Sequence, residues 1–280
     1  MRWYALKIGI VSRTDKIEAL ELNNSIINYL LENKVNVEVD SNIADKLEDY
    51  EEYRTSINDM TSDFVLCIGG DGTVLNAQHV LSPKKIPILS INMGTVGFLT
   101  EVEPEDVFEC LDALLSYNFF IEERVQLDVY CSEQWITVLN ELVIMTSQPG
   151  KMLDLEITVD EEIVDNVRAD GLIISTPSGS TAYAMSAGGP IVDPRVDAAV
   201  IIPICPFKLN TRPKIVPADS NITVKFNDVD KKGLAVLDGV NDKEYGYLDE
   251  IRLRKSDNFA YFVRFRKNFY ESVNKKLTVG

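Results

Sequence analysis

A short glycine-rich segment carries the most distinctive chemistry of this chain. Gly69, Gly70 and Gly72 surround an aspartate, Asp71, and Thr73 follows directly, before a helix-like stretch that begins at Val74. Backbone N–H groups in such a turn, at the start of a helix, favour a bound phosphate. A carboxylate placed there repels phosphate unless it binds a metal, accepts a proton or holds a hydroxyl group. The segment therefore predicts a phosphate site in which Asp71 has a chemical role.

Two further segments have unusual local sequence. Asn140 and Glu141 interrupt an apolar stretch over 138–145, so they form either a structural network or a ligand contact. An amide beside a carboxylate fits two neighbouring ribose hydroxyls. The run 175–186 is dense in glycine, serine and threonine. It is either a polar turn with a helix N-cap or, as we prefer, a backbone surface for a flat ligand.

Composition excludes several other chemistries. His79 is the only histidine and the four cysteines are widely separated, so zinc sites and Cys–His or Ser–His–Asp catalysis have no residues to use. We expect four buried, reduced thiols. Neither G-x-x-x-x-G-K-[ST] nor G-x-G-x-x-G occurs, which argues against a P-loop kinase and an ordinary dinucleotide dehydrogenase. A net charge of −16 argues against a nucleic-acid partner.

No stretch of the sequence predicts a membrane span. The longest apolar candidate, 198–207, is short and broken by Pro203 and Pro206. The first residues lack an apolar core and a small-residue cleavage site, and they indicate a first strand. We therefore expect a cytoplasmic protein with no membrane partner.

The first part of the chain alternates strand-like and helix-like stretches. Helices are predicted over 16–32 and 104–115, the second with Val107, Phe108, Leu111 and Leu115 on one face. Strands are predicted over 7–11, 35–39, 64–68 and 86–92. This alternation indicates a parallel sheet with crossover helices, a Rossmann-like α/β domain.

From residue 121 the pattern changes to short strands with turns at 160–162 and 238–239. The predicted strands are 125–130, 135–145, 153–159, 163–167, 172–175, 222–226, 234–237 and 251–255. They indicate a β-rich, sandwich-like domain over 119–267. The Rossmann-like domain then covers 1–118 together with about 268–280, where a helix over 269–277 returns to it.

Taken together, these segments resemble the NAD kinase family, whose members use ATP or polyphosphate. The resemblance covers nearly the whole chain and rests on 8–11, 69–73, 91–100, 140–141, 170–190 and 203–206. The GGDGT sequence alone is weaker evidence for this family, because diacylglycerol kinases, sphingosine kinases and phosphofructokinases contain similar sequences. Its combination with Asn140-Glu141 and the serine-rich run is specific.

The resemblance implies transfer of a terminal phosphoryl group to the 2′-hydroxyl of the adenosine ribose of NAD, which gives NADP. The donor is ATP or another donor such as polyphosphate, with Mg²⁺ or another divalent metal held by the donor phosphates. Asp71 is implied to be the general base. Gly69, Gly70, Gly72 and Thr73 form the phosphate-binding loop.

The resemblance also implies the NAD-binding residues and an oligomer. Asn140 and Glu141 hold ribose, Asp170 contacts the nicotinamide end or the ligand of a neighbouring subunit, and Tyr183 packs on a ring. The full set is Asp71, Gly72, Asn140, Glu141, Lys151, Arg168, Asp170, Thr181, Ala182, Tyr183, Ala184, Met185 and Ser186. A homo-dimer or homo-tetramer is expected.

The sequence departs from the family pattern at three positions. Phe207 stands where many relatives carry histidine, Val240 follows Asp-Gly where relatives often have glutamine, and Asn76 replaces a frequent basic residue. Two alternatives remain: a GGDGT-type lipid kinase and a non-catalytic NAD(P) sensor. The acidic charge, with no membrane-docking stretch, argues against the lipid kinase. Asp71 argues against the sensor, because a pure binder gains little from a carboxylate beside phosphate.

Overall fold

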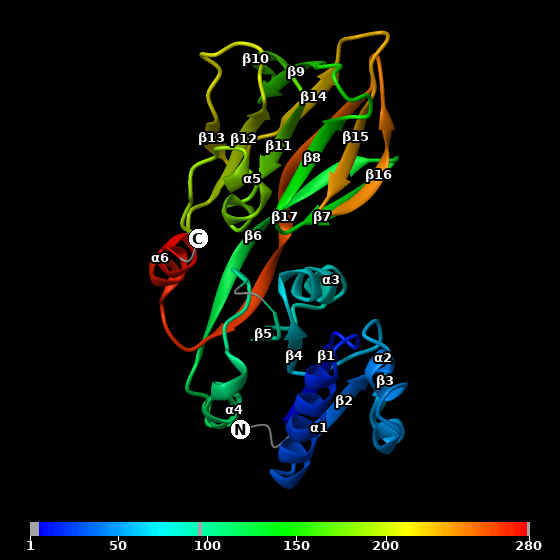
Figure 1. The fold of residues 1–280 in the computed structure, drawn as a ribbon, viewed down its shortest axis with the longest axis vertical. Coiled ribbons are helices and arrows are strands. Elements are labelled where there is room, and N and C mark those ends of the chain that lie inside the picture. The colour runs from blue at the N-terminus through cyan, green and yellow to red at the C-terminus, as the bar shows by residue number, and fades with distance from the viewer. Residues whose placement is uncertain (1–5, 95–96, 279–280) are drawn as a thin grey trace. The chain divides into compact units, whose positions relative to one another are not determined.

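The computed structural model describes residues 6–94 and 97–278. Thr95 and Val96 of the 91–100 motif lie outside the described residues. The chain forms two compact units, Met1–Glu123 with Ala260–Gly280 and Arg124–Phe259 (Figure 1). Strands β6 (Phe120–Cys131) and β17 (Glu250–Arg264) contribute residues to both units. The fold is thus an α/β unit, which includes the C-terminal helix, followed by a β-rich unit.

The sheet of the first unit is parallel, with the order β5-β4-β1-β2-β3. Its strands are β1 (Lys7–Ser12), β2 (Asn36–Asp40), β3 (Arg54–Thr55), β4 (Phe64–Gly69) and β5 (Ile88–Asn92). Apolar residues of β1, β4 and β5 pack with helix residues in one buried core. The Rossmann-like prediction for this part of the chain is confirmed.

Helices connect and flank these strands. The α-helices are α1 (Ile17–Glu32), α2 (Ser41–Ala44), α3 (Asp71–Leu81), α4 (Val107–Leu115) and α6 (Phe269–Thr278). Short 3₁₀ turns are η1 (Glu48–Tyr53), η2 (Ser82–Lys84) and η3 (Pro104–Asp106). Among the described helices, none is long and apolar enough to cross a membrane.

The apolar face predicted for α4 is only partly buried. Val107, Leu111 and Leu114 are buried, at a spacing of four and three residues that keeps them on one side of the helix. Phe108 is 39% exposed and packs its ring against Tyr29 of α1, with ring centroids 5.2 Å apart. An aromatic pair at the edge of the core therefore replaces the burial expected for Phe108.

The second unit contains two antiparallel sheets. In one sheet β9 (Leu153–Val159) lies between β10 (Glu162–Ala169) and β14 (Ile222–Phe226), which pairs with β17. The other has the order β13-β12-β11-β8-β15-β16. Its strands are β8 (Glu141–Thr146), β11 (Gly171–Ser175), β12 (Ala198–Ile204), β13 (Lys214–Pro217), β15 (Gly233–Leu237) and β16 (Val240–Tyr245). Apolar residues of both sheets share one core, as predicted for a sandwich.

Several sequence predictions differ from this arrangement. The stretch 135–145 is two strands, β7 (Gln134–Val138), which pairs with β6, and β8, so Asn140 lies between strands. Strands β12, β13 and β16 were missed, β12 because its apolar run contains Pro203. Cys205 is exposed and Cys110 half-buried, so only Cys67 and Cys131 match the expected buried thiols.

One buried charge network closes the first unit. The guanidinium of Arg264 donates to Glu122 at 2.9 Å and to Glu101 at 2.8 Å. Glu101 also accepts the backbone N–H of Phe265 at 3.1 Å. The side chains of Arg264 and Glu101 are each only 6% exposed. Residues more than a hundred positions apart in the chain are therefore held together by one buried cation.

Replacing that cation tests how far the first unit depends on it. We expect Arg264→Met to lower the free energy of unfolding by about 3–5 kcal/mol, because it removes the cation that pairs with the buried Glu101 and the half-buried Glu122. Urea denaturation measures this change. Arg266→Met, at an exposed arginine two positions later, is the matched control and should stay within about 0.5 kcal/mol. Equal losses in the two variants would contradict the assignment.

Candidate functional site

The glycine turn lies at the end of β4 and passes directly into α3. The helix begins at Asp71, three residues before the predicted start at Val74, because Gly70 already accepts the N–H of Val74 at 3.2 Å. A Cβ on Gly69 would come within 2.3 Å of the Thr73 hydroxyl oxygen. Glycine at position 69 is therefore required by the tight passage from strand to helix.

The carboxylate of Asp71 is held in one orientation by the backbone. Its Oδ2 accepts the N–H of Phe98 at 2.7 Å and its Oδ1 accepts the N–H of Leu99 at 3.0 Å. A Cβ on Gly97 would come within 2.0 Å of Asp71 Oδ1, so only glycine permits this approach. Each carboxylate oxygen keeps a further lone pair. The arrangement fixes Asp71 and leaves it able to accept a proton.

Gly70 and Gly72 have a different role from Gly69. A Cβ at either position would meet no protein atom within 4 Å. Gly70 precedes α3 without a side-chain cap, and the first N–H groups of a helix have no acceptor within the helix. A side chain at these positions would stand where an anion approaches the amides. The turn therefore fits a phosphate group held by backbone N–H groups and the helix dipole.

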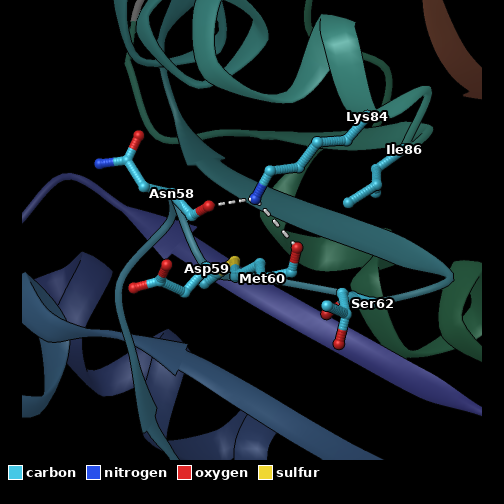
Figure 2. A pocket seen from close by; sticks show the side chains of 7 residues that line it. Asn58, Asp59, Met60, Ser62, Lys84 and Ile86 are labelled. Carbon is cyan, nitrogen blue, oxygen red and sulfur yellow. Dashed lines mark hydrogen bonds between the residues drawn. The ribbon is translucent and has the colours of Figure 1, made fainter.

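A polar hollow of about 540 Å³ lies elsewhere on the first unit. It is lined by residues that precede β4 and β5: Asn58, Asp59, Met60, Thr61, Ser62, Lys84 and Ile86. Figure 2 shows the Lys84 ammonium pointing toward the carbonyls of Asn58 and Met60. This hollow is at the amino ends of the strands, whereas the glycine turn is at their carboxyl ends, where open α/β sheets bind ligands.

A second cluster forms in the β-rich unit around Asp238. Its carboxylate accepts three consecutive backbone N–H groups, from Leu139 at 2.7 Å, Asn140 at 2.8 Å and Glu141 at 3.0 Å. Asp238 has φ of +46° and Gly239 has φ of +86°, so the turn between β15 and β16 is left-handed. From the sequence, Asp238 was predicted only as part of a turn, and its contacts show that it also positions Asn140 and Glu141.

Glu141 is a buried acid with one unpaired oxygen. Glu141 is 7% exposed as a whole residue, and its Oε2 has no hydrogen-bond partner among the described residues. Burial raises the pKa of Glu141 to about 8, the charge of Asp238 adds to this, and the N–H of Tyr183 opposes it. A buried carboxyl oxygen without a partner is costly. A ligand hydroxyl that donates to Oε2 would remove that cost.

The serine-rich segment is packed onto the same place. Thr176 donates its N–H to the carbonyl of Asn140 at 2.8 Å and its hydroxyl to that of Leu139 at 2.5 Å. A Cβ on Gly179 would come within 2.2 Å of the Asn140 carbonyl oxygen. The segment continues into η4 (Gly179–Thr181) and α5 (Tyr183–Ser186), so the helix begins two residues after Thr181. The hydrogen bonds from Thr176 hold the chain at the start of β8, where Asn140 and Glu141 lie.

The other predicted residues of this unit divide into two groups. Tyr183 lies beside Glu141 and is 42% exposed. Thr181 and Ala184 are buried, and Ala182, Met185 and Ser186 belong to the same short segment. Asp170 precedes β11, whose last residue Ser175 pairs with Glu141, so it lies ~16 Å away along the strand. Arg168 packs its guanidinium on Phe207, 5.5 Å from the ring centroid, and Lys151 is exposed.

The protein groups offer little to a metal ion. Among residues 6–94 and 97–278, no three histidine, cysteine or acidic side chains lie close enough together to hold one. Asp71 accepts hydrogen bonds from two backbone amides, and Glu141 has Asp238 as an acidic neighbour. A metal that enters this site would therefore be held mainly by the phosphates of a bound ligand.

Comparison with known proteins identifies the family. The profile of the ATP-NAD kinase N-terminal domain matches residues 8–119, and that of the C-terminal domain matches residues 139–265. The chain belongs to the NAD kinase family. An NAD kinase of Methanosphaera stadtmanae is 74% identical over 275 residues, which cover 98% of this chain and 100% of that protein.

Solved structures of NAD kinase family members share the fold. A yeast NADH kinase complexed with NADH has a TM-score of 0.89 at 26% identity, covering 99% of this chain and 88% of that one. An NAD kinase from Archaeoglobus fulgidus in complex with ATP has a TM-score of 0.79 at 30% identity, covering 98% and 100%. The GGDGT turn and the Asn140-Glu141 pair thus lie in a fold shared with NAD(H) kinases.

The buried acid predicts a pH dependence of stability. Because the pKa of Glu141 is raised from 4.5 to about 8, the folded state keeps a proton that the unfolded state releases between these values. The free energy of unfolding should therefore fall as pH rises through this window, by up to ~1.4 kcal/mol per pH unit.

Urea denaturation between pH 6 and pH 8 measures the slope. Glu141→Gln should remove most of it, whereas Glu162→Gln, at an exposed glutamate of the same unit, should not. If the wild type and Glu141→Gln gave parallel pH curves, the raised pKa would be wrong.

Proposed function

We propose that this chain phosphorylates the 2′-hydroxyl of the adenosine ribose of NAD and produces NADP. The observation that carries the proposal is the Asp71 carboxylate, held by two backbone amides at the start of a helix that follows a glycine turn. A fixed carboxylate beside a phosphate cradle serves an acceptor hydroxyl. Family membership supports NAD as the molecule that carries this hydroxyl.

In the proposed reaction Asp71 accepts the proton of the 2′-hydroxyl as its oxygen attacks the terminal phosphorus of the donor. The bond from that phosphorus to the bridging oxygen of the donor breaks, and the shortened donor leaves. The amides at Gly70 and Gly72 hold the donor phosphates. Phosphoryl transfer needs little covalent help from a protein, so one oriented base and good positioning suffice without histidine.

We assign the donor to the nucleoside triphosphates, with ATP as the first candidate. The Archaeoglobus fulgidus relative, described in complex with ATP, supports this choice. The donor would enter as its Mg²⁺ complex, in which the metal neutralises charge on the transferring group. Polyphosphate remains the second donor to test. In cells we expect a cytoplasmic homo-dimer or homo-tetramer, as for the family.

NAD binding is assigned mainly to the β-rich unit. Asn140 and Glu141 would hold ribose hydroxyls, one of them hydrogen-bonded to the unpaired Oε2 of Glu141. Tyr183 would pack its exposed ring on a base or on the nicotinamide. Asp170, Arg168 and Lys151 lie toward the other end of β11, or on the surface, and would meet more distant groups of the dinucleotide.

A direct assay tests the reaction. We expect the purified protein with NAD, ATP and Mg²⁺ to form NADP and ADP in equal amounts, measured by coupled fluorescence and chromatography. Tight NAD binding by calorimetry with no NADP would indicate a sensor. Phosphorylation of a diacylglycerol or sphingosine vesicle but not of NAD would indicate a lipid kinase. Either result would overturn the proposal.

Asp71→Asn tests the base. We expect the turnover rate to fall about 10²–10⁴-fold, because the amide cannot accept the hydroxyl proton. The circular dichroism spectrum and the calorimetric affinity for NAD should stay close to those of the wild type. Asp59→Asn, at an exposed aspartate of the same unit, should keep full turnover. Near-normal turnover of Asp71→Asn would make the assignment wrong.

A further inference from the structure

The proposed donor site lacks a cation in its own helix. From Gly69 to Gln78 the turn and the first two turns of α3 contain no lysine or arginine, and Asp71 adds a negative charge. The outer phosphates of a triphosphate carry several negative charges, and backbone amides alone balance them poorly. A second element must supply positive charge to this turn.

The strand order brings the loop after β1 to the turn. β1 is the neighbour of β4 in the parallel sheet, with Ser12 opposite Ile68. The N–H of Arg13 continues this pairing and donates to the carbonyl of Ile68 at 3.0 Å. Residues 13–16 and the glycine turn therefore leave the same edge of the sheet side by side.

Within this loop, Lys16 reaches past β4 to the strand on its far side. Its ammonium donates to the carbonyl of Met93 at 3.1 Å. Met93 follows β5, and its N–H donates to the carbonyl of Gly69 at 3.0 Å. The strand order β5-β4-β1 places Gly69 between the two strands that Lys16 connects. The ammonium of Lys16 is thus fixed at the glycine turn by one hydrogen bond.

The remaining capacity of Lys16 distinguishes it from a structural lysine. An ammonium has three N–H donors, and Lys16 uses one on Met93. By contrast, the ammonium of Lys84 donates to three carbonyls, that of Ile57 and those of Asn58 and Met60, of which Figure 2 shows the last two. Lys84 closes a loop with all its donors, whereas Lys16 is exposed and keeps two donors for another acceptor.

The other charges of the loop leave Lys16 as its net cation. Arg13 makes two hydrogen bonds to Asp15, at 2.8 and 2.6 Å, and holds the pKa of Asp15 at about 2. This pair is neutral as a unit. Lys16 then contributes the unbalanced positive charge of residues 13–16 next to the phosphate-binding amides.

We propose that Lys16 binds the outer phosphates of the phosphoryl donor at the Gly69–Thr73 turn. This inference rests on the proposed function for the choice of a polyphosphate ligand, and it assigns the cation that the turn and α3 do not supply. Lys16 is a donor-binding residue and takes no part in proton transfer.

Ligands that differ in phosphate number provide the test. Calorimetry compares the affinities of the wild type and Lys16→Met for ATP, AMP, inorganic tripolyphosphate and NAD. We expect the affinities of Lys16→Met for ATP and tripolyphosphate to fall about ten- to hundredfold, the range for a lost charge-assisted hydrogen bond. Its affinities for AMP and NAD should change less than about twofold, and Lys16→Arg should recover most of the loss.

Controls separate this role from a structural one. Lys46→Met removes an exposed lysine of the same unit and should leave all four affinities unchanged. Equal affinity of the wild type and Lys16→Met for ATP would overturn the proposal. A parallel loss of ATP, AMP and NAD affinity with a lower melting temperature would also overturn it, in favour of a structural bond to Met93.

The proposed function can fail independently of this inference. If the wild type binds ATP more tightly than Lys16→Met but forms no NADP, the reaction is wrong and the phosphate contact stands. If the wild type binds neither ATP nor tripolyphosphate, the assignment of Lys16 is wrong even where another donor supports turnover.

Discussion

The proposed active site depends on the two hydrogen bonds that the Asp71 carboxylate accepts from the backbone N–H groups of Phe98 and Leu99. Without them, an anion beside a phosphate cradle would turn toward a cation or solvent. The bonds keep the carboxylate fixed, and the amides of the glycine turn remain available for phosphate. Gly97 is required by the close approach of Asp71, and Gly69 by the tight passage from β4 into α3. Phosphate binding and proton acceptance can then occur on neighbouring groups without the carboxylate rotating into the anion's place.

The same physical device recurs in the β-rich unit, where Asp238 accepts three consecutive backbone N–H groups. There the fixed carboxylate orders the chain at Asn140 and Glu141 rather than acting on a substrate. Its charge also helps to keep Glu141 protonated at pH values well above the ordinary pKa of a glutamic acid. The protein thus holds a buried acid whose unpaired oxygen fits a ligand hydroxyl. We interpret the free-energy cost of burying this unpaired oxygen as the consequence of its role in binding a ligand hydroxyl.

Local patterns predicted much of the fold but few of the contacts that make the site. Patterns of adjacent residues were enough to predict the apolar run of β4, the alternation of β14 and the turn at Asp160. The start of α3 at Asp71 was missed, because a glycine at position 72 normally argues against a helix. Asp238 lies 98 residues from Asn140, so no local pattern connects them. Roles that arise from such distant contacts need the folded chain.

A crystal structure of the protein with NAD and a non-hydrolysable ATP analogue would test the central claim most directly. The account predicts a carboxylate oxygen of Asp71 within ~2.6–3.2 Å of the 2′-oxygen of the adenosine ribose. The N–H groups of Phe98 and Leu99 should still donate to the same carboxylate. A complex in which the 2′-oxygen lies beyond hydrogen-bond reach of Asp71, or in which Asp71 has left both amides to bind a metal, would contradict it.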